Sequence, residues 1–198
     1  RLLYTDSDTR LAFTPAADFH GSISDVVTVK AWDRTGGYTN GEAGVPTIHP
    51  VIGTLYTSGI AYGVTLSPDG NTAYVADGTS GLRIIDVSNP SAPTLIETLD
   101  TSGSAYGVTL SPDGNTAYVA DYMSSGGLRI IDVSNSSAPT LTGTLAISGY
   151  LNGVTLSSDG NTAYVADEVS GLQIIDVRDS STPTLTGTVD TSGNAVGV

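Results

Sequence analysis

Carboxylates at regular intervals are the residues of this sequence with the clearest capacity for chemistry. Asp77, Asp121 and Asp167 each close an identical run, Ala-Tyr-Val-Ala-Asp. If these runs lay around one ring, their oxygens would suit Ca²⁺, a hard cation that takes several oxygen ligands. The alternative is structural: each carboxylate accepts backbone N–H bonds or pairs with an arginine. Recurrence in every copy favours the structural alternative, because residues that build a repeat recur and single binding sites do not.

An arginine that could pair with these carboxylates is present in two of the three copies. Arg83 and Arg129 are the candidate partners in two copies, but Gln173 takes their place in the third, so an ion pair is not needed in every copy. Two other aspartate sets also recur, in Ile-Ile-Asp-Val runs and in Asp-Gly turns: Asp86, Asp132 and Asp176, then Asp69, Asp113 and Asp159. The turn set lacks the spacing of an EF-hand loop, so we interpret it as hairpin chemistry.

Groups suited to acid–base or nucleophilic catalysis are scarce. His20 and His49 are the only histidines, and cysteine is absent, which leaves no disulfide and no Cys-ligated metal. The sequence has no Gly-x-Ser-x-Gly elbow, phosphate-binding loop or dinucleotide fingerprint. We therefore predict that the chain is not an enzyme and that calcium is the one cofactor to consider.

Tyrosines divide into a set that recurs and a set that varies. Tyr74, Tyr118 and Tyr164 hold the same place in every copy, and we assign them to packing between repeats. Other positions differ between near-identical copies, which is where a binding surface can be encoded; plain loop variation is the alternative. The candidates for contact with a ligand or partner are Tyr62, Tyr106, Tyr122, Met123 and Tyr150.

A long internal repeat must position all of these residues. Its three copies span 63–100, 107–146 and 153–190, a fourth begins at 197, and their opening glycines are 44, 46 and 44 residues apart. Such a period is typical of arrays of small units. Each unit is predicted to form four short strands, with a Ser-Pro-Asp-Gly or Ser-Ser-Asp-Gly turn after the first. The middle strands are apolar on both faces, as in radially packed propeller blades.

The opening glycines predict where the strands of neighbouring units approach one another most closely. Gly63, Gly107 and Gly153 begin the first strand of each unit, where backbones that converge on a central axis leave no room for a side chain. The fold class is therefore all-β, an incomplete β-propeller of four-stranded blades.

The run AYVADGTSGLRIIDVSNPSAPTL resembles the LVIVD-repeat family, and SPDGNTAYV also resembles YVTN-type propellers of bacterial surface proteins. The resemblance covers about residues 50–198 and implies a β-propeller. Residues 51–57 match the last strand of a unit whose first three strands do not precede it. We expect this segment to close the ring as an outer strand, and residues 48–198 alone to be unstable or oligomeric.

Residues 1–34 differ from the repeat and contain three predicted strands, too few for a sandwich of their own. The run RLAFTPAADFHGSISDVVTVKAWD resembles the closing strands of cadherin-like or immunoglobulin-like modules of large bacterial surface proteins. That resemblance implies a β-sandwich end and calcium candidates at Asp33, Asp6 and Asp8, with solvated turn aspartates as the alternative. Residues 35–47 have linker composition, and 48–198 form the propeller region.

The composition of the chain limits the classes of partner that it can bind. The net charge of −13 repels phosphate, which excludes nucleic acid, and it also argues against anionic lipid. No apolar run reaches membrane-spanning length. Because the first residue is Arg1 and both ends fall inside recognisable units, we expect a piece of a longer extracellular or cell-surface protein.

The predicted function is a non-enzymatic repeat scaffold for adhesion, protein or glycan interaction, or self-assembly. The alternatives are a lactonase-like or hydrolase-like propeller enzyme with its site in further blades, and a calcium-stabilised spacer or fibre subunit.

Overall fold

A computed structural model describes residues 2–4, 11–13, 22–23, 52–122 and 126–198. The chain divides into two compact units, Arg1–Ile52 and Gly53–Val198. Every regular element within the described residues is a β-strand. Among these residues there is no helix both long and apolar enough to cross a bilayer.

The first unit contains a three-stranded antiparallel sheet in the order β1 (Leu2–Tyr4), β2 (Leu11–Phe13) and β3 (Ser22–Ile23). The sequence predicted strands over residues 1–5, 10–15 and 23–33, which overlap β1, β2 and, at Ile23 alone, β3. The rest of the third predicted strand, the linker 35–47 and the calcium candidates Asp6, Asp8 and Asp33 lie outside the described residues. The cadherin-like or immunoglobulin-like module therefore stays a prediction.

The second unit consists of three four-stranded antiparallel sheets, each made by one copy of the repeat. We call them blades 1, 2 and 3. Blade 1 contains β4 (Gly63–Leu66), β5 (Thr72–Ala76), β6 (Leu82–Asp86) and β7 (Thr94–Leu99). Blade 2 contains β8 (Ala105–Leu110), β9 (Thr116–Asp121), β10 (Gly127–Asp132) and β11 (Thr140–Ala146). Blade 3 contains β12 (Leu151–Leu156), β13 (Thr162–Asp167), β14 (Gly171–Asp176) and β15 (Thr184–Val189). Four strands per repeat confirm the sequence prediction.

The turn between the first two strands of each blade is fixed by its own side chains. In blade 1 the Ser67 hydroxyl donates to Asp69 Oδ1 at 2.5 Å, and the same oxygen accepts the Asn71 N–H at 3.1 Å. Gly70 has a φ of +73°, a conformation that favours glycine. The same bonds recur in blades 2 and 3, so the turn is local chemistry that each copy carries for itself.

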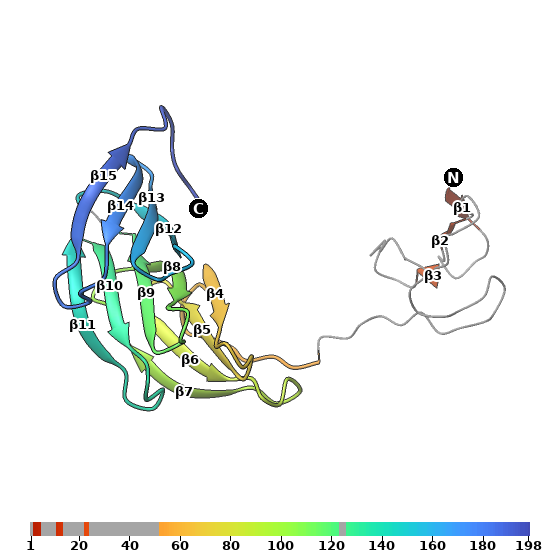
Figure 1. Cartoon of the computed structure of the whole chain (residues 1–198). Helices are drawn as coiled ribbons and strands as arrows, with labels where there is room; N and C mark the ends of the chain where they lie inside the picture. The colour runs from red at the N-terminus through yellow and green to blue at the C-terminus, as the bar shows by residue number, and fades with distance from the viewer. Residues whose placement is uncertain (1, 5–10, 14–21, 24–51, 123–125) are drawn as a thin grey trace. The chain divides into compact units, whose positions relative to one another are not determined.

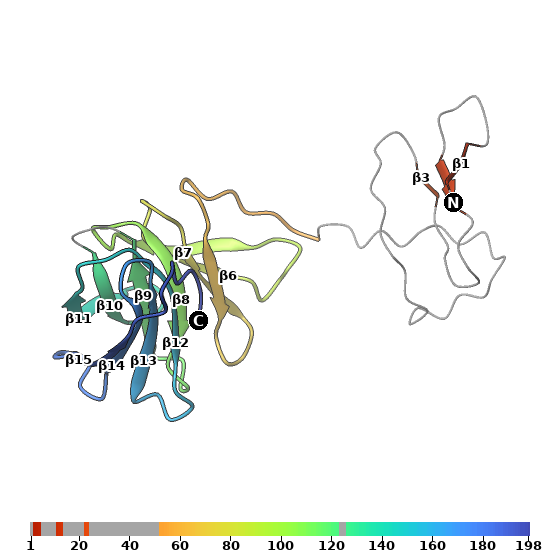
Figure 2. The same ribbon diagram turned by 90° about the horizontal axis from the view of Figure 1, so that it is seen from above.

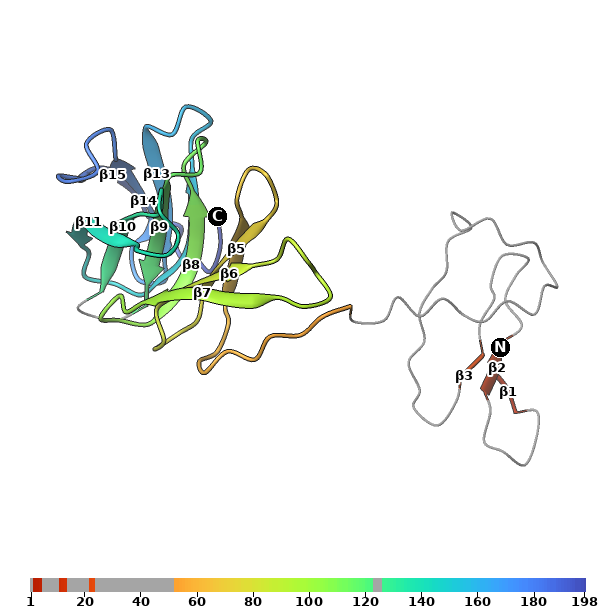
Figure 3. The ribbon, with the colours of Figure 1, turned by 90° about the horizontal axis from the view of Figure 1, so that it is seen from below.

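Apolar side chains cover both faces of the middle strands, and each face packs against a different neighbour. Tyr74, Leu82 and Ile84 of blade 1 pack against Val119 and Ile131 of blade 2. Blade 2 turns its opposite face to blade 3 in the same way. The three sheets stand side by side in Figure 1, and the views from above and below show the same succession (Figure 2 and Figure 3).

The inner strands β4, β8 and β12 approach one another closely at the opening glycines. A Cβ added to Gly63 would lie 2.7 Å from the Tyr106 carbonyl oxygen, and one on Gly107 would lie 2.9 Å from that of Asn152. Neither position has room for a side chain. This confirms the expectation for Gly63 and Gly107, whereas a Cβ on Gly153 would lie 3.3 Å from Gly197 Cα, a tight contact that a small shift can relieve. In Figure 1 the outer strands β7, β11 and β15 lie on the far side of the sheets from β4, β8 and β12.

The succession of blades does not close into a ring. Val64 of β4 is 67% exposed, whereas the equivalent Val108 and Val154 are 9% and 8% exposed because a preceding blade covers them. The architecture is therefore an incomplete propeller.

Residues 53–57 lie against blade 1 without forming a regular strand. A Cβ on Gly53 would meet the Pro90 carbonyl oxygen, and one on Gly143 of β11 would meet that of Ser180, which holds the same place in the repeat. Leu55 also packs on the open face of blade 1. The segment thus occupies the place of a preceding blade's outer strand, although ring closure itself stays a prediction.

Candidate functional site

Four of the five candidate contact residues come together in one stack of aromatic rings. The ring centroids of Tyr62 and Tyr106 are 3.7 Å apart, with 15° between the ring planes. Those of Tyr106 and Tyr122 are 4.4 Å apart at 16°, and those of Tyr122 and Tyr150 are 4.8 Å apart at 32°. We call these four residues the tyrosine row. Met123, the fifth candidate, lies outside the described residues.

The register of the inner strands brings the row together. Within blade 2, the start of β8 pairs with the end of β9 through Ala105 and Asp121, so Tyr106 and Tyr122 emerge at the same sheet edge. The Tyr122 N–H donates to the Ser104 carbonyl at 2.7 Å and extends this pairing. Tyr62 enters from the start of blade 1 and Tyr150 from the start of blade 3. The row therefore crosses all three blades at one end of their inner strands.

Exposure differs along the row. Tyr62 is 46% exposed and Tyr150 is 39% exposed, whereas Tyr106 and Tyr122 between them are partly buried. Each of the two central rings has a neighbouring ring on both faces. The row therefore presents ring edges along its length and open ring faces at its two ends.

Hydrogen bonds raise the pKa of the two central phenols of the row, Tyr106 and Tyr122. A bond with the Tyr62 hydroxyl, assisted by burial, raises the pKa of Tyr106 to about 12. The Tyr122 hydroxyl donates to Glu168 Oε2 at 2.9 Å, and this bond is the main reason that the pKa of Tyr122 is also raised. Asn194 Nδ2 donates to the other oxygen of Glu168 at 2.7 Å. The site thus combines four phenols, one carboxylate and one amide side chain.

The recurring aspartates at the end of the second strand are structural. Asp121 is fully buried, receives Arg129 Nε at 2.7 Å and accepts the Thr101 hydroxyl at 2.8 Å. Burial raises the pKa of Asp121, and the bonds from Arg129 and Thr101 act in the opposite direction. Each of these aspartates holds the loop that enters its blade, and this confirms the structural alternative.

The other two blades build the same contact with different donors. In blade 1, Asp77 receives Arg83 Nε at 2.7 Å and the Gly59 N–H at 3.0 Å. In blade 3, Asp167 receives Gln173 Nε2 at 3.4 Å instead of an arginine. Asp77 Oδ1 is buried without a partner among the described residues.

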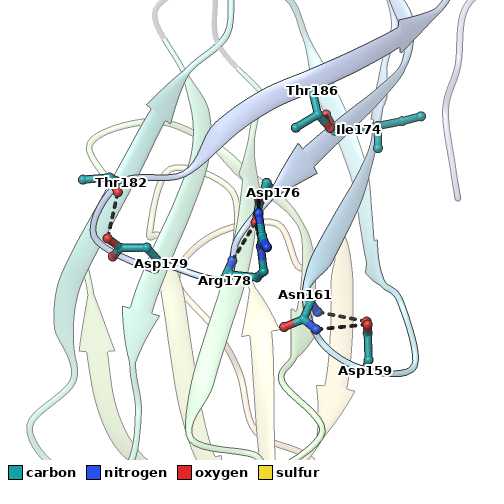
Figure 4. Close-up of polar contacts among 8 residues, drawn as sticks. All are labelled: Asp159, Asn161, Ile174, Asp176, Arg178, Asp179, Thr182 and Thr186. Atoms are coloured by element: carbon teal, nitrogen blue, oxygen red, sulfur yellow. Dashed lines mark hydrogen bonds and ion pairs between the residues drawn. The ribbon is translucent and has the colours of Figure 1, made fainter.

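The remaining aspartates are also bound locally. Asp86 Oδ1 accepts the Ser88 N–H at 2.9 Å and its hydroxyl at 2.6 Å. In blade 3 the equivalent Asp176 pairs with Arg178, beside a hollow of about 390 Å³ that Asp179, Thr182 and Thr184 complete. Figure 4 shows two separate contacts here, one between Asp176 and Arg178 and one between Asp179 and Thr182. Among the described residues no three His, Cys, Asp or Glu side chains are grouped to hold a metal ion.

Sequence reasoning missed Glu168 and Asn194 as members of the site. Glu168 takes the place in blade 3 that Tyr122 takes in blade 2 and Gly78 takes in blade 1. This difference among the three copies was the feature of the sequence that could have identified Glu168 as part of the site.

Solved structures share the fold at low sequence identity. A functionally unknown protein from Desulfotomaculum acetoxidans is 22% identical, with a TM-score of 0.58 over 69% of this chain and 43% of that chain. The periplasmic gluconolactonase PpgL of Pseudomonas aeruginosa is 17% identical, with a TM-score of 0.56 over 66% and 42%. The β-propeller domain of Cps50 (Swd1) from Myceliophteria thermophila is 17% identical, with a TM-score of 0.54 over 67% and 42%.

These likenesses support the propeller fold, and the chain spans about two fifths of the length of each of these structures. No curated protein matches the chain. The LVIVD repeat, in contrast, matches three consecutive segments, 58–101, 102–146 and 148–191. Because these matches cover more than half of the sequence, the chain belongs to the LVIVD repeat family.

Proposed function

We propose that this chain is a non-enzymatic, extracellular or cell-surface binding scaffold that contacts its partner through the tyrosine row. The observation that carries the proposal is the stacking of Tyr62, Tyr106, Tyr122 and Tyr150 across three blades at one end of their inner strands. Tyrosine suits such a surface because its ring supplies apolar contact area and its hydroxyl supplies hydrogen bonds.

The pattern of recurrence supports this assignment. Residues that recur in every copy fold the blades. Asp69 is bonded within its exposed turn, Asp121 is buried against Arg129, and Tyr118 packs between two blades. The row, in contrast, uses positions where the copies differ, and it leaves Tyr62 and Tyr150 substantially exposed. A scaffold that repeats its framework and varies one edge is suited to recognition.

The partner classes that fit this surface are a protein, a glycan or a second copy of the chain. The acidic charge of the whole chain, −13, disfavours nucleic acid as a partner. The extracellular placement rests on the acidic, cysteine-free composition and is part of the proposal.

The experiment compares binding to a displayed random-peptide library and to an array of neutral and charged glycans. The full chain is tested beside the double variant Tyr62→Ala/Tyr150→Ala, which removes both exposed ends of the row. Tyr56→Ala is the matched control, because Tyr56 is 93% exposed and lies outside the row. The proposal is supported if peptides or glycans that bind the parent chain no longer bind the double variant but still bind the Tyr56→Ala control.

Two results would contradict it. Ligands that bind the double variant as tightly as they bind the control would show that the partner surface lies elsewhere. Hydrolysis of δ-gluconolactone above the uncatalysed rate by the purified chain would overturn the non-enzymatic part of the proposal.

A further inference from the structure

We infer that the partner of the tyrosine row is a basic segment of a protein, docked through an arginine side chain beside Glu168. This inference rests on the proposed function and narrows it to one partner class. The geometry points to arginine because the row joins aromatic rings to a carboxylate that has only neutral hydrogen-bond donors.

Charge is the first argument. Residues 53–198 contain three arginines and fourteen aspartates and glutamates, so the net charge is 3 minus 14, or −11. The three arginines are already paired, in the ion pairs Arg83–Asp77, Arg129–Asp121 and Arg178–Asp176. Within the described residues of this unit no cation pairs with Glu168, whose two bonds come from a phenol and an amide. A cationic group is what the site lacks.

The aromatic surface is the second argument. A cation over the face of a tyrosine ring is attracted by the ring quadrupole. Tyr150 ends the row, is 39% exposed and has a ring of the row on one face only. Its carbonyl accepts the Glu168 N–H at 3.0 Å, so a cation on its open face lies beside the residue that carries the carboxylate. Because a guanidinium is planar, stacks on aromatic faces and is less strongly hydrated than an ammonium, arginine fits this combination better than lysine.

The arrangement of the rings favours a basic segment over a neutral glycan. Sugar rings stack on open aromatic faces, but both faces of Tyr106 and Tyr122 are covered by neighbouring tyrosines. The central part of the row therefore offers edges, hydroxyls and one carboxylate. These groups suit a side chain that donates several hydrogen bonds and carries positive charge.

The test uses the full chain and two labelled peptides followed by fluorescence anisotropy. One peptide carries two arginines in a Gly-Ser background, and the other carries citrulline at both positions, which keeps the shape and removes the charge. We expect the arginine peptide to bind at least tenfold more tightly than the citrulline peptide. We further expect Glu168→Gln to weaken the arginine peptide about tenfold and to leave the citrulline peptide unchanged.

Glu97→Gln is the matched control, because Glu97 is an exposed carboxylate of β7 outside the row. If Glu97→Gln weakens the arginine peptide as much as Glu168→Gln does, the attraction is diffuse and the inference is overturned. Equal binding of both peptides, or no binding of either, also overturns it.

Maltohexaose as a competitor separates this inference from the proposed function. Maltohexaose binding that disappears in Tyr62→Ala/Tyr150→Ala but persists in Glu168→Gln would show that the row binds glycans. In that case only the arginine inference fails. If instead the arginine peptide depends on Glu168 but tolerates the double variant, the site is not the row and the proposed function fails with it.

Discussion

Tyr118 and Tyr62 are the same residue type in the same array of sheets, yet their surroundings are opposite. Tyr118 recurs in every copy and is 4% exposed, inside the cluster that joins blade 2 to blade 3. Tyr62 is absent from the third copy and is 46% exposed at the end of the tyrosine row. Of these two tyrosines, the one that recurs is packed between blades and the one that varies is exposed.

The carboxylates repeat this contrast. Asp121 recurs, is fully buried and is paired with Arg129. Glu168 occurs once, is partly exposed and accepts only from neutral groups. Asp121 secures the loop that enters its blade, whereas Glu168 is the carboxylate at which we propose that a charged ligand binds.

The largest effect is expected from Tyr118→Ala, with Tyr62→Ala as its matched control. Truncating a buried aromatic residue leaves a cavity and costs about 3–5 kcal/mol. Tyr62 loses one stacking contact, worth about 1 kcal/mol. Urea denaturation of the two variants measures both free energies of unfolding. Equal losses would remove the distinction between the recurring and varying tyrosines.

The second effect is expected from Asp121→Asn. This variant leaves Arg129, whose side chain is 14% exposed, without its charged partner, and we expect a loss of about 2–3 kcal/mol. Arg129→Gln should cost only about 1 kcal/mol, because it reproduces the neutral bond that Gln173 makes in blade 3. Glu168→Gln should leave stability unchanged. A loss for Glu168→Gln as large as that for Asp121→Asn would show that Glu168 is part of the folding framework.

A third effect separates the interior of the array from its open end. Val154→Ala removes two methyl groups from the packed interface of blades 2 and 3 and should cost about 2 kcal/mol. Val64 holds the same place in blade 1 but is 67% exposed, so Val64→Ala should be neutral. Thermal denaturation of both variants gives the comparison. If Val64→Ala proves as costly, a further blade or a second chain covers that face in solution.

The smallest effect is expected at the turns, and it should be the same in all three blades. Ser67→Ala, Ser111→Ala and Ser157→Ala each remove the main bond that lowers the pKa of the turn aspartate, which is Asp69, Asp113 and Asp159 in turn. A lowered pKa stabilises the fold above the ordinary value of 3.8, and this contribution is lost as the pH falls through the folded pKa. Each variant should therefore be less stable than the parent at pH 7, and the difference should shrink as the pH falls through the folded pKa. A part independent of pH should remain, because the serine oxygen also accepts a threonine N–H. Unequal losses among the blades would show that the turns depend on their neighbours.

Much of the fold was predictable because its signals are local and repeated. The Ser-Pro-Asp-Gly turn, the two-faced apolar strands and the opening glycines each determine structure within one copy. The first two expectations are confirmed, and the third is confirmed at Gly63 and Gly107. The pairing of Arg83 with Asp77 was expected as part of the structural alternative to calcium, but with both residues on one strand. Arg83 instead lies in β6, and Asp77 directly follows β5.

The site was predictable only in part. Variation among the copies singled out the four tyrosines, but their stacking depends on the distance between blades, which no single copy encodes. Glu168 and Asn194 were missed because their contact with the row comes from blade 3 and from the segment after β15. The proposed calcium candidates Asp6, Asp8 and Asp33 stay predictions.

The most direct test of the account is to see which tyrosines respond when a ligand binds. The chain has ten tyrosines, and ¹³C labelling of their rings gives separate NMR signals for the row and for the recurring set. Titration with the tightest binder from the peptide library or glycan array should move the signals of Tyr62, Tyr106, Tyr122 and Tyr150 and leave those of Tyr74 and Tyr118 in place. Movement of Tyr74 and Tyr118 with a silent row would contradict the assignment of recognition to the varying positions.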